Sequence, residues 1–244
     1  MQIVLRLNAA NGLTLPIDYN HIVQSAIYHS IAPALATFLH EQGFTANGRV
    51  FRLFCFSRLL GPFTMDRNSG KITFGNDVRL VISSPVVDFV QSLANGLLQQ
   101  GGWRLGSTFA DITEIGAEQP VVESENINIR TLSPVTAYST MSRPDGRKYT
   151  VYFQPGDPDY NALITANLQK KYQAFFREEP PEGEVKVKAA GQIKMNLLQY
   201  KGTVIKGYSG PLQLTGPQEL LQMAVDCGLG SKNSQGFGCL ALSN

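Results

Sequence analysis

The chain has 244 residues, 43% of them hydrophobic and 16% charged, a composition typical of a globular protein with one large domain or two small ones. No run of about 18 apolar residues occurs, so no membrane-spanning helix is expected. The formal net charge of +2 argues against a protein that coats nucleic acid over its whole surface, but it is compatible with a local basic face.

The amino terminus and the cysteines favour a cytoplasmic protein. Residues 1–8 alternate apolar and polar side chains like a strand, and they lack the basic start and long apolar core of a secretion signal. Three cysteines are present, and Cys55 and Cys239 lie in apolar runs, which indicates buried free thiols in a reducing compartment. The chain has no Cys-x-x-Cys pair and no His/Cys cluster, so neither a metal nor another cofactor is expected.

The first half of the chain has the element order β-α-β-β-α-β. A shorter helical piece after Pro33 follows the first helix, and the last two of the middle strands flank a turn at 75–77. In chain order the expected elements cover 2–8, 18–30, 34–41, 50–59, 71–74, 78–83, 85–99 and 103–115.

The second half repeats this order less clearly, after a polar junction at 116–125. Its expected elements cover 127–136, 148–153, 157–176, 184–199, 203–214, 217–227 and 238–242, with a hairpin between 184–199 and 203–214. The sequence therefore predicts an α+β protein of two tandem ferredoxin-like (RRM-like) domains, 1–118 and 126–244. Many RNA-binding modules use this topology.

A glycine-rich segment at 228–238 points most directly to a ligand. Glycine adopts positive φ readily and lets backbone N–H groups converge on phosphate oxygens. The segment therefore suggests a nucleic-acid or nucleotide ligand. Its spacing fits neither a Walker A loop nor a dinucleotide fingerprint, and a flexible hairpin loop without a ligand is the alternative. The candidate RNA-binding residues of this segment are Gly228, Gly230, Ser231, Lys232, Asn233, Gly236 and Gly238.

Basic residues are concentrated in the last third of the chain. Lys186 and Lys188 alternate with valines, so their side chains share one face of a strand, and Lys194 follows in the same expected hairpin. These three lysines are predicted to follow a phosphate backbone, and an ordinary solvated face is the alternative.

Candidate acid–base residues lie in and after the first helical region. The three histidines of the chain are His21, His29 and His40, and His40 stands at a helix end before a glycine-containing loop. With Tyr28 on the first helix and Arg52 on the next expected strand, His40 could cleave RNA without a metal: two groups move protons and the cation stabilises the phosphorane. His29 is the rival base, and each of these side chains could also serve packing or solvation alone.

Several motifs together resemble the CRISPR-associated endoribonuclease family that processes precursor CRISPR RNA, within the RAMP superfamily. The resemblance runs through nearly the whole chain in order. Its motifs are Leu15-Pro16-x-Asp18-Tyr19-Asn20, Ile27-Tyr28, Phe38-Leu39-His40-Glu41-x-Gly43, Leu53-Phe54-x-Phe56-Ser57, Asn95-Gly96-Leu97, Thr131-Leu132-Ser133-Pro134 and Gly228-x-Gly230-x5-Gly236-Phe237-Gly238.

This resemblance implies two ferredoxin-like domains and metal-independent cleavage of CRISPR repeat RNA, giving 2′,3′-cyclic phosphate and 5′-hydroxyl ends. Tyr28 and His40 match the family's tyrosine and histidine, and Arg52 takes a position that is often lysine. Arginine keeps the charge but does not readily donate a proton, which implies an electrostatic role. His29 stays the second candidate base. The implied partners are repeat RNA and effector-complex subunits, for a monomer or homodimer with no membrane partner.

Two alternatives to this enzyme remain open at this point. A non-catalytic RNA-binding subunit of a CRISPR effector complex would bind RNA without cutting it and would be indifferent to loss of His40. A small-molecule enzyme of ferredoxin-like fold would not bind RNA at physiological salt.

Overall fold

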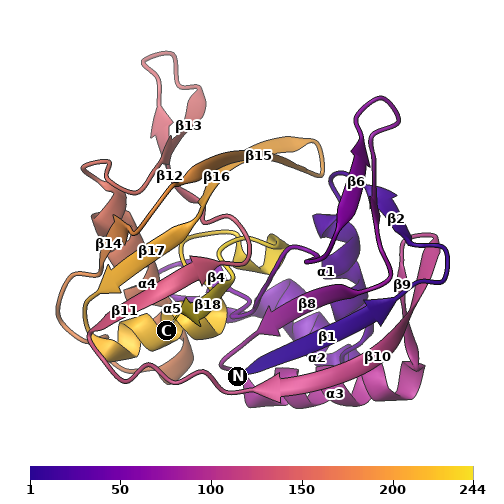
Figure 1. Ribbon diagram of the computed structural model, residues 1–244. Helices are drawn as coiled ribbons and strands as arrows, with labels where there is room; N and C mark the ends of the chain where they lie inside the picture. Colours follow the sequence, from indigo (N-terminus) through magenta and orange to yellow (C-terminus); the bar gives the residue numbers. More distant parts are fainter. Residues whose placement is uncertain (244) are drawn as a thin grey trace.

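Two βαββαβ units lie side by side in the computed structural model, which describes residues 1–243 (Figure 1). The first unit consists of β1 (Gln2–Asn8), α1 (Asn20–His29), β5 (Cys55–Phe56), β8 (Val78–Ser83), α3 (Val87–Gln100) and β10 (Thr108–Glu118). The second unit consists of β11 (Asn126–Thr131), α4 (Tyr160–Phe176), β14 (Lys186–Ala189), β17 (Pro211–Thr215), α5 (Gln218–Cys227) and β18 (Leu240–Ser243).

Both units have the same antiparallel strand order. The sheet of the first runs β5-β8-β1-β10, extended at one edge by β9 (Gly102–Leu105), and that of the second runs β14-β17-β11-β18. Numbering the strands of each unit from one to four, the order is 2-3-1-4 in both, which is the ferredoxin-like arrangement. The predicted α+β fold with two tandem ferredoxin-like units is confirmed.

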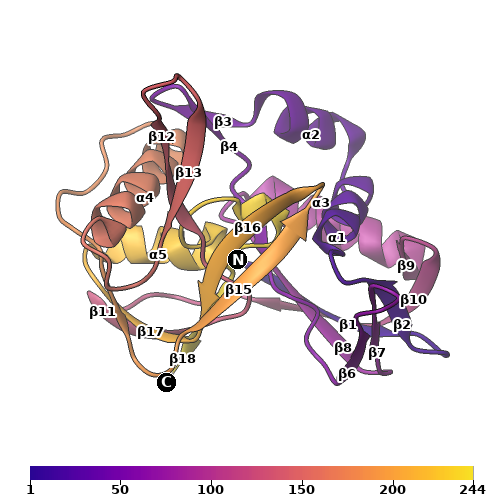
Figure 2. The same cartoon turned by 90° about the horizontal axis from the view of Figure 1, so that it is seen from above.

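Smaller elements are inserted between the elements of the two units. They are β2 (Leu13–Pro16), α2 (Pro33–Thr37), the π-helical turn η1 (Phe38–Gln42), β3 (Phe44–Ala46), β4 (Arg49–Phe51), β6 (Phe63–Asp66), β7 (Lys71–Phe74), β12 (Ala137–Ser142), β13 (Lys148–Phe153), β15 (Lys194–Tyr200), β16 (Thr203–Ser209) and the 3-10 turn η2 (Asn233–Gln235). Figure 2 shows β15 and β16 side by side, extending from the second unit toward α1. Among residues 1–243, no helix is long and apolar enough to cross a membrane.

The helices are held to their sheets by apolar stripes. In α3 the buried side chains are Phe89, Val90, Leu93 and Leu97, which follow the spacing of one helix face. Each unit has its own buried core, and the stripe of α3 belongs to the first while α4 and α5 fill the second. The local pattern of each helix therefore agrees with the layer against which it packs.

The expected strand over 50–59 is wrong in its middle. β4 ends at Phe51 and β5 begins at Cys55, and between them Leu53 has a positive φ of 51°. Leu53 is buried in the core of the second unit, whereas the next residue, Phe54, is buried in the core of the first. Because this apolar run supplies two cores in turn, the chain bends where the pattern alone indicated a continuous strand.

Two other expected pairings also differ. β7 and β8 do not form a hairpin across 75–77, because β7 pairs with β2 and β6 while β8 belongs to the first sheet. The expected strand over 103–115 is a hairpin of β9 and β10 that turns between Leu105 and Thr108. The predicted hairpin of the second half is present in two steps, β15 with β16 and β14 with β17.

The two units are joined by a buried contact. An apolar cluster between them contains Cys55, Val81, Leu132 and Cys239. The amino-terminal ammonium of the first unit forms an ion pair of 2.8 Å with Asp226 on α5. Cys227 is buried as well, and all three cysteines are free, as predicted. This contact fixes the position of one unit against the other and so defines the space between them.

Candidate active site

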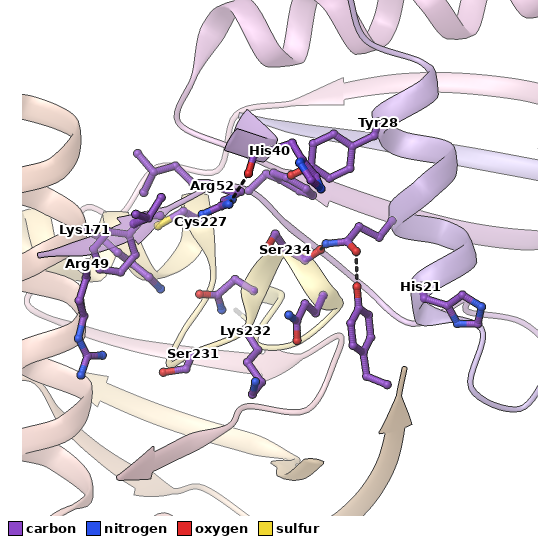
Figure 3. A pocket seen from close by; sticks show the side chains of 18 of the residues that line it. His21, Tyr28, His40, Arg49, Arg52, Lys171, Cys227, Ser231, Lys232 and Ser234 are labelled. Carbon is purple, nitrogen blue, oxygen red and sulfur yellow. Dashed lines mark hydrogen bonds between the residues drawn. The ribbon is translucent and has the colours of Figure 1, made fainter. Parts of the chain in front are cut away.

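A cleft of about 790 Å³ lies between the two units, with walls from α1, the segment before β5, β12 and the glycine-rich loop (Figure 3). Among the described residues that line it, none is Asp or Glu. Its lining includes the cations Arg49, Arg52, Lys171, Lys201 and Lys232. A cleft lined by charges of one sign concentrates a ligand of the opposite sign, here a polyanion.

The structure brings Tyr28, His40 and Arg52 together at one wall of the cleft. Tyr28 is half-buried on α1, and exposed His40 lies on the π-helical turn η1. The two rings meet edge to face with centroids 6.2 Å apart. Arg52 Nη2 donates a hydrogen bond of 2.6 Å to the backbone carbonyl of His40 (Figure 3). Arg52 therefore holds the histidine turn as well as supplying charge.

The local fold of this wall follows from the segment around it. The π-helical turn ends at Gly43, which has a φ of +64° and donates its N–H to Phe38 O at 2.7 Å. The β3–β4 hairpin then reaches the second unit, where Asn47 Nδ2 donates to Gln173 Oε1 on α4 at 3.0 Å. Arg52 lies between the end of β4 at Phe51 and the bend at Leu53, and there it lies beside His40. The position of Arg52 therefore depends on this bend and not on the face of a strand.

Burial changes the acidity of Tyr28. Burial raises the pKa of its hydroxyl above the usual value of about 10, and neighbouring Arg52 offsets part of this increase by favouring the phenolate. The hydroxyl is therefore protonated at neutral pH. Tyr28 can donate a hydrogen bond or a proton to an oxygen in the cleft, but it cannot begin a reaction as the base.

The other two histidines lie elsewhere on α1. His29 is exposed and does not line the cleft; its Nδ1 lies 2.7 Å from the carbonyl oxygen of Ser25, beside a second cavity. His21 lines both spaces, and its Nδ1 lies 2.8 Å from Asp18 O. Of the three imidazoles, that of His40 is the one beside Tyr28 and Arg52.

The glycine-rich loop is packed between the two units. A Cβ at Gly238 would lie 2.1 Å from Leu229 O, and one at Gly236 would lie 2.6 Å from the ring of Phe56. The N–H groups of Gly228, Gly236 and Gly238 already donate to carbonyl oxygens of the protein, at 2.9–3.0 Å. The expectation that these three N–H groups grip phosphate is therefore wrong: these glycines allow close packing, and side chains are what the loop offers to the cleft.

Ser231 and Lys232 line the cleft together with Asn233, Ser234 and Gln235 of the same loop (Figure 3). Lys232 has a φ of 62°, and its Nζ lies 5.3 Å from the centre of the Tyr138 ring on β12. Its partial burial lowers the pKa of the Lys232 ammonium. Asn233 is buried and serves the loop itself, since its Nδ2 donates to the carbonyls of Leu229 and Phe237 at 3.1 Å.

Buried Lys171 holds the glycine-rich loop by hydrogen bonds to its backbone. Its side chain is 3% exposed, and Nζ donates to Gly228 O at 2.6 Å and to Gly230 O at 3.0 Å. Burial lowers the pKa of this ammonium, as expected where desolvation penalises the charged form. Sequence reasoning did not identify this role, although a lysine four and seven residues after buried Asn167 and Ile164 stands on the apolar face of α4.

A polar chain connects α1 to the loop and to β15. Gln24 Nε2 donates to Ser234 O at 2.7 Å, and the Tyr200 hydroxyl donates to Gln24 Oε1. Neither Gln24 nor Tyr200 was predicted from the sequence, because three segments far apart in the polypeptide meet here. These two hydrogen bonds fix the wall that carries Tyr28 relative to the loop that carries Lys232.

The predicted basic strip lies outside the cleft. Lys186 and Lys188 are exposed on β14, on the sheet face opposite buried Val187, and exposed Lys194 begins β15. None of the three lines the cleft. Among residues 1–243, no group of three or more His, Cys, Asp and Glu side chains could hold a metal ion.

Comparison with known proteins covers almost the entire chain. Residues 14–115 match the family CRISPR-associated protein Cas6, N-terminal, and residues 117–242 match CRISPR associated protein Cas6, C-terminal. The chain belongs to the Cas6 family. It is 30% identical over 98% of its length to CRISPR-associated endoribonuclease Cas6 1 of Methanocaldococcus jannaschii, covering 91% of that protein. It is 26% identical over 98% of its length to CRISPR-associated endoribonuclease Cas6 of Pyrococcus furiosus, covering 88% of that protein.

The fold of this Cas6 protein is shared with solved structures. One, described as an RAMP protein binding different RNA substrates, superposes with a TM-score of 0.84 at 21% identity and covers all of both chains. The family expected from the sequence motifs is confirmed, together with its tandem ferredoxin-like fold.

Proposed function

We propose that this Cas6 protein is an endoribonuclease that cuts precursor CRISPR RNA within its repeats, without a metal ion, and leaves 2′,3′-cyclic phosphate and 5′-hydroxyl ends. The observation that carries the proposal is the grouping of His40, Tyr28 and Arg52 at the wall of a cleft lined by cations. The activity named for the two relatives supports it.

In the proposed reaction the 2′-oxygen of the RNA attacks the neighbouring phosphorus, and the bond from phosphorus to the 5′-oxygen breaks. His40 accepts the proton of the 2′-hydroxyl. Histidine is the side chain that most often serves as general base at neutral pH, and His40 is exposed at the cleft wall. The displaced 5′-oxygen needs a proton to leave as a hydroxyl.

Tyr28 is proposed to supply that proton or to donate a hydrogen bond to the leaving oxygen. Its raised pKa keeps the hydroxyl protonated until the leaving oxygen becomes basic. The positive charge of Arg52 stabilises both the phenolate and the extra negative charge on the phosphorane. Proton transfer from His40 back to Tyr28 through solvent restores both groups.

The cleft is proposed to bind the RNA backbone through its cations. Lys201 and Lys232 line it from the second half of the chain, whereas Tyr28, His40 and Arg52 come from the first. Ser231 adds a hydroxyl, and the packed glycines keep Lys232 in place. Roles in RNA binding for Lys186, Lys188 and Lys194 stay predictions, which single substitutions to alanine would test on binding of the same RNA.

The test is cleavage of repeat RNA in EDTA under single-turnover conditions. We expect wild-type cleavage to be unchanged by chelation, and His40→Ala to slow it by about 100-fold or more, the contribution of a general acid or base. His29→Ala is the comparison, with a smaller loss than His40→Ala. Loss of wild-type cleavage in EDTA would contradict metal independence. Tight RNA binding without any product would instead favour a non-catalytic RNA-binding subunit.

A further inference from the structure

A second cavity of about 470 Å³ adjoins the cleft along α1 and lies between this helix and the turn of the β9–β10 hairpin. His21 and Ser25 line both this cavity and the cleft. With His29 they form a row at four-residue spacing, which places them on one face of α1. The cavity is therefore continuous with the proposed RNA site along a row of polar side chains.

The two imidazoles of this row are held in one tautomer. Nδ1 of His21 lies 2.8 Å from Asp18 O, and Nδ1 of His29 lies 2.7 Å from Ser25 O. A carbonyl oxygen can only accept, so each Nδ1 carries a hydrogen and donates it. Each Nε2 is left to bind a ligand: as an acceptor when the ring is neutral, and as a donor when it is protonated.

The rim and the floor of the cavity differ in chemistry. Arg104 on β9 is exposed at the rim and pairs with no carboxylate among residues 1–243. The floor is formed by Ile22, Ala26 and Trp103. The indole N–H of Trp103 is already satisfied, since it donates to Ser30 Oγ at 2.9 Å. A ligand that fits has an anionic group for the rim and a flat, largely apolar part for the floor.

We propose that this cavity is a second RNA subsite, which takes one unpaired nucleotide of the segment that flanks the cleavage point. Its phosphate contacts Arg104 and accepts a hydrogen bond from Nε2–H of the doubly protonated His29 ring, and its base lies on the floor. The volume falls within the range of about 300–1,000 Å³ typical of small-ligand sites. The base must be unstacked to enter, as is usual when proteins recognise single-stranded RNA. This inference rests on the proposed function, since the occupant belongs to the RNA that the cleft holds.

The experiment compares binding of three RNAs by fluorescence anisotropy. Each carries a 2′-deoxy nucleotide at the cleavage point so that it stays intact. One spans only the cleavage point, and the other two extend it by three unpaired nucleotides on the 5′ or the 3′ side. The wild type is expected to bind one extended RNA about tenfold more tightly than the short one, the effect of docking a base and a phosphate.

The measured quantity is the ratio of the affinity for the extended RNA to the affinity for the short RNA. Arg104→Ala and His29→Ala are expected to reduce this ratio to about one or two, and Arg104→Lys is expected to keep most of it. Arg67→Ala is the matched control: Arg67 is an exposed cation outside both cavities, and its loss should leave the ratio at its wild-type value. The inference is overturned if Arg104→Ala keeps the wild-type ratio, if Arg67→Ala lowers it equally, or if the wild type gains nothing from either extension.

Cleavage of the unmodified short RNA by the wild type is followed in parallel, which separates the two proposals. If the wild type leaves this RNA uncut, but Arg104→Ala abolishes the preference for the extended RNA, the proposed subsite stands and the proposed nuclease activity is refuted. If the wild type cuts the RNA, but Arg104→Ala keeps the wild-type affinity ratio, the subsite alone is refuted.

Discussion

Gly238→Ala should be among the most damaging single-methyl additions in this protein. Gly238 has a φ of +73°, and a Cβ built on it would lie 2.1 Å from the carbonyl oxygen of Leu229 and 2.7 Å from Asn233 Nδ2. That carbonyl accepts from Asn233 Nδ2 at 3.1 Å, and Leu229 N–H donates to Gly238 O at 2.9 Å. The added methyl group therefore displaces backbone that two hydrogen bonds hold.

The cost can be divided into three parts. The left-handed conformation costs alanine about 1–2 kcal/mol relative to glycine. Overpacking costs about 1–3 kcal/mol, and loosening of the two hydrogen bonds about 1 kcal/mol each. We expect a total of about 4 kcal/mol with partial relaxation. For a chain of this size that lowers Tm by about 8–16 °C.

Gly146→Ala is the matched control. Gly146 has nearly the same φ, +79°, and nothing lies within 4 Å of its added Cβ. It should lose only the conformational part, about 1–2 kcal/mol. Both variants are measured by urea unfolding followed by circular dichroism. If Gly238→Ala lost no more stability than Gly146→Ala, the conclusion that these glycines serve close packing would be refuted.

Two further predictions concern the cleft. Tyr28→Phe should slow single-turnover cleavage about tenfold or more at every pH from 6 to 9. The reason is that burial raises the pKa of Tyr28, so the hydroxyl stays protonated throughout this range. If the rates of Tyr28→Phe and the wild type became equal at pH 9, the hydroxyl would already be deprotonated there and this reasoning would be wrong. Lys232→Ala should weaken RNA binding and lower the slope of log K against log salt by about 0.7, the effect of one lost phosphate contact on single-stranded RNA. Arg67→Ala should leave that slope as it is, and an equal fall in both variants would remove Lys232 from the interface.

Local patterns in the sequence were enough to predict the two ferredoxin-like units. The apolar spacing of α3 and α5, and the order of strands and helices in each half, specify the two ferredoxin-like units. The grouping of Tyr28 with His40 follows from motifs that lie close in sequence. Such features depend on residues that lie close together in the chain or on the order of elements along it, and the sequence displays both directly.

What the sequence did not reveal depends on contacts between the units. The run from Val50 to Leu59 is strongly apolar and predicts one continuous strand, but its side chains enter two different cores, so the chain bends at Leu53. Lys171 and Gln24 look ordinary in sequence because their partners are backbone carbonyls more than 50 residues away. The glycines suggested a phosphate-binding loop because glycine-rich loops that bind phosphate and glycine-rich loops that only pack closely have the same composition.

Cleavage of repeat RNA that carries a single 2′-deoxy nucleotide on the 5′ side of the cut tests the central claim most directly. If His40 activates the 2′-hydroxyl as attacking group, the wild type should bind this RNA and leave it uncut while the matching ribonucleotide substrate is consumed, and mass spectrometry should find a 2′,3′-cyclic phosphate on the product of the latter. Cleavage of the deoxy-substituted RNA at the same position would contradict the proposed mechanism.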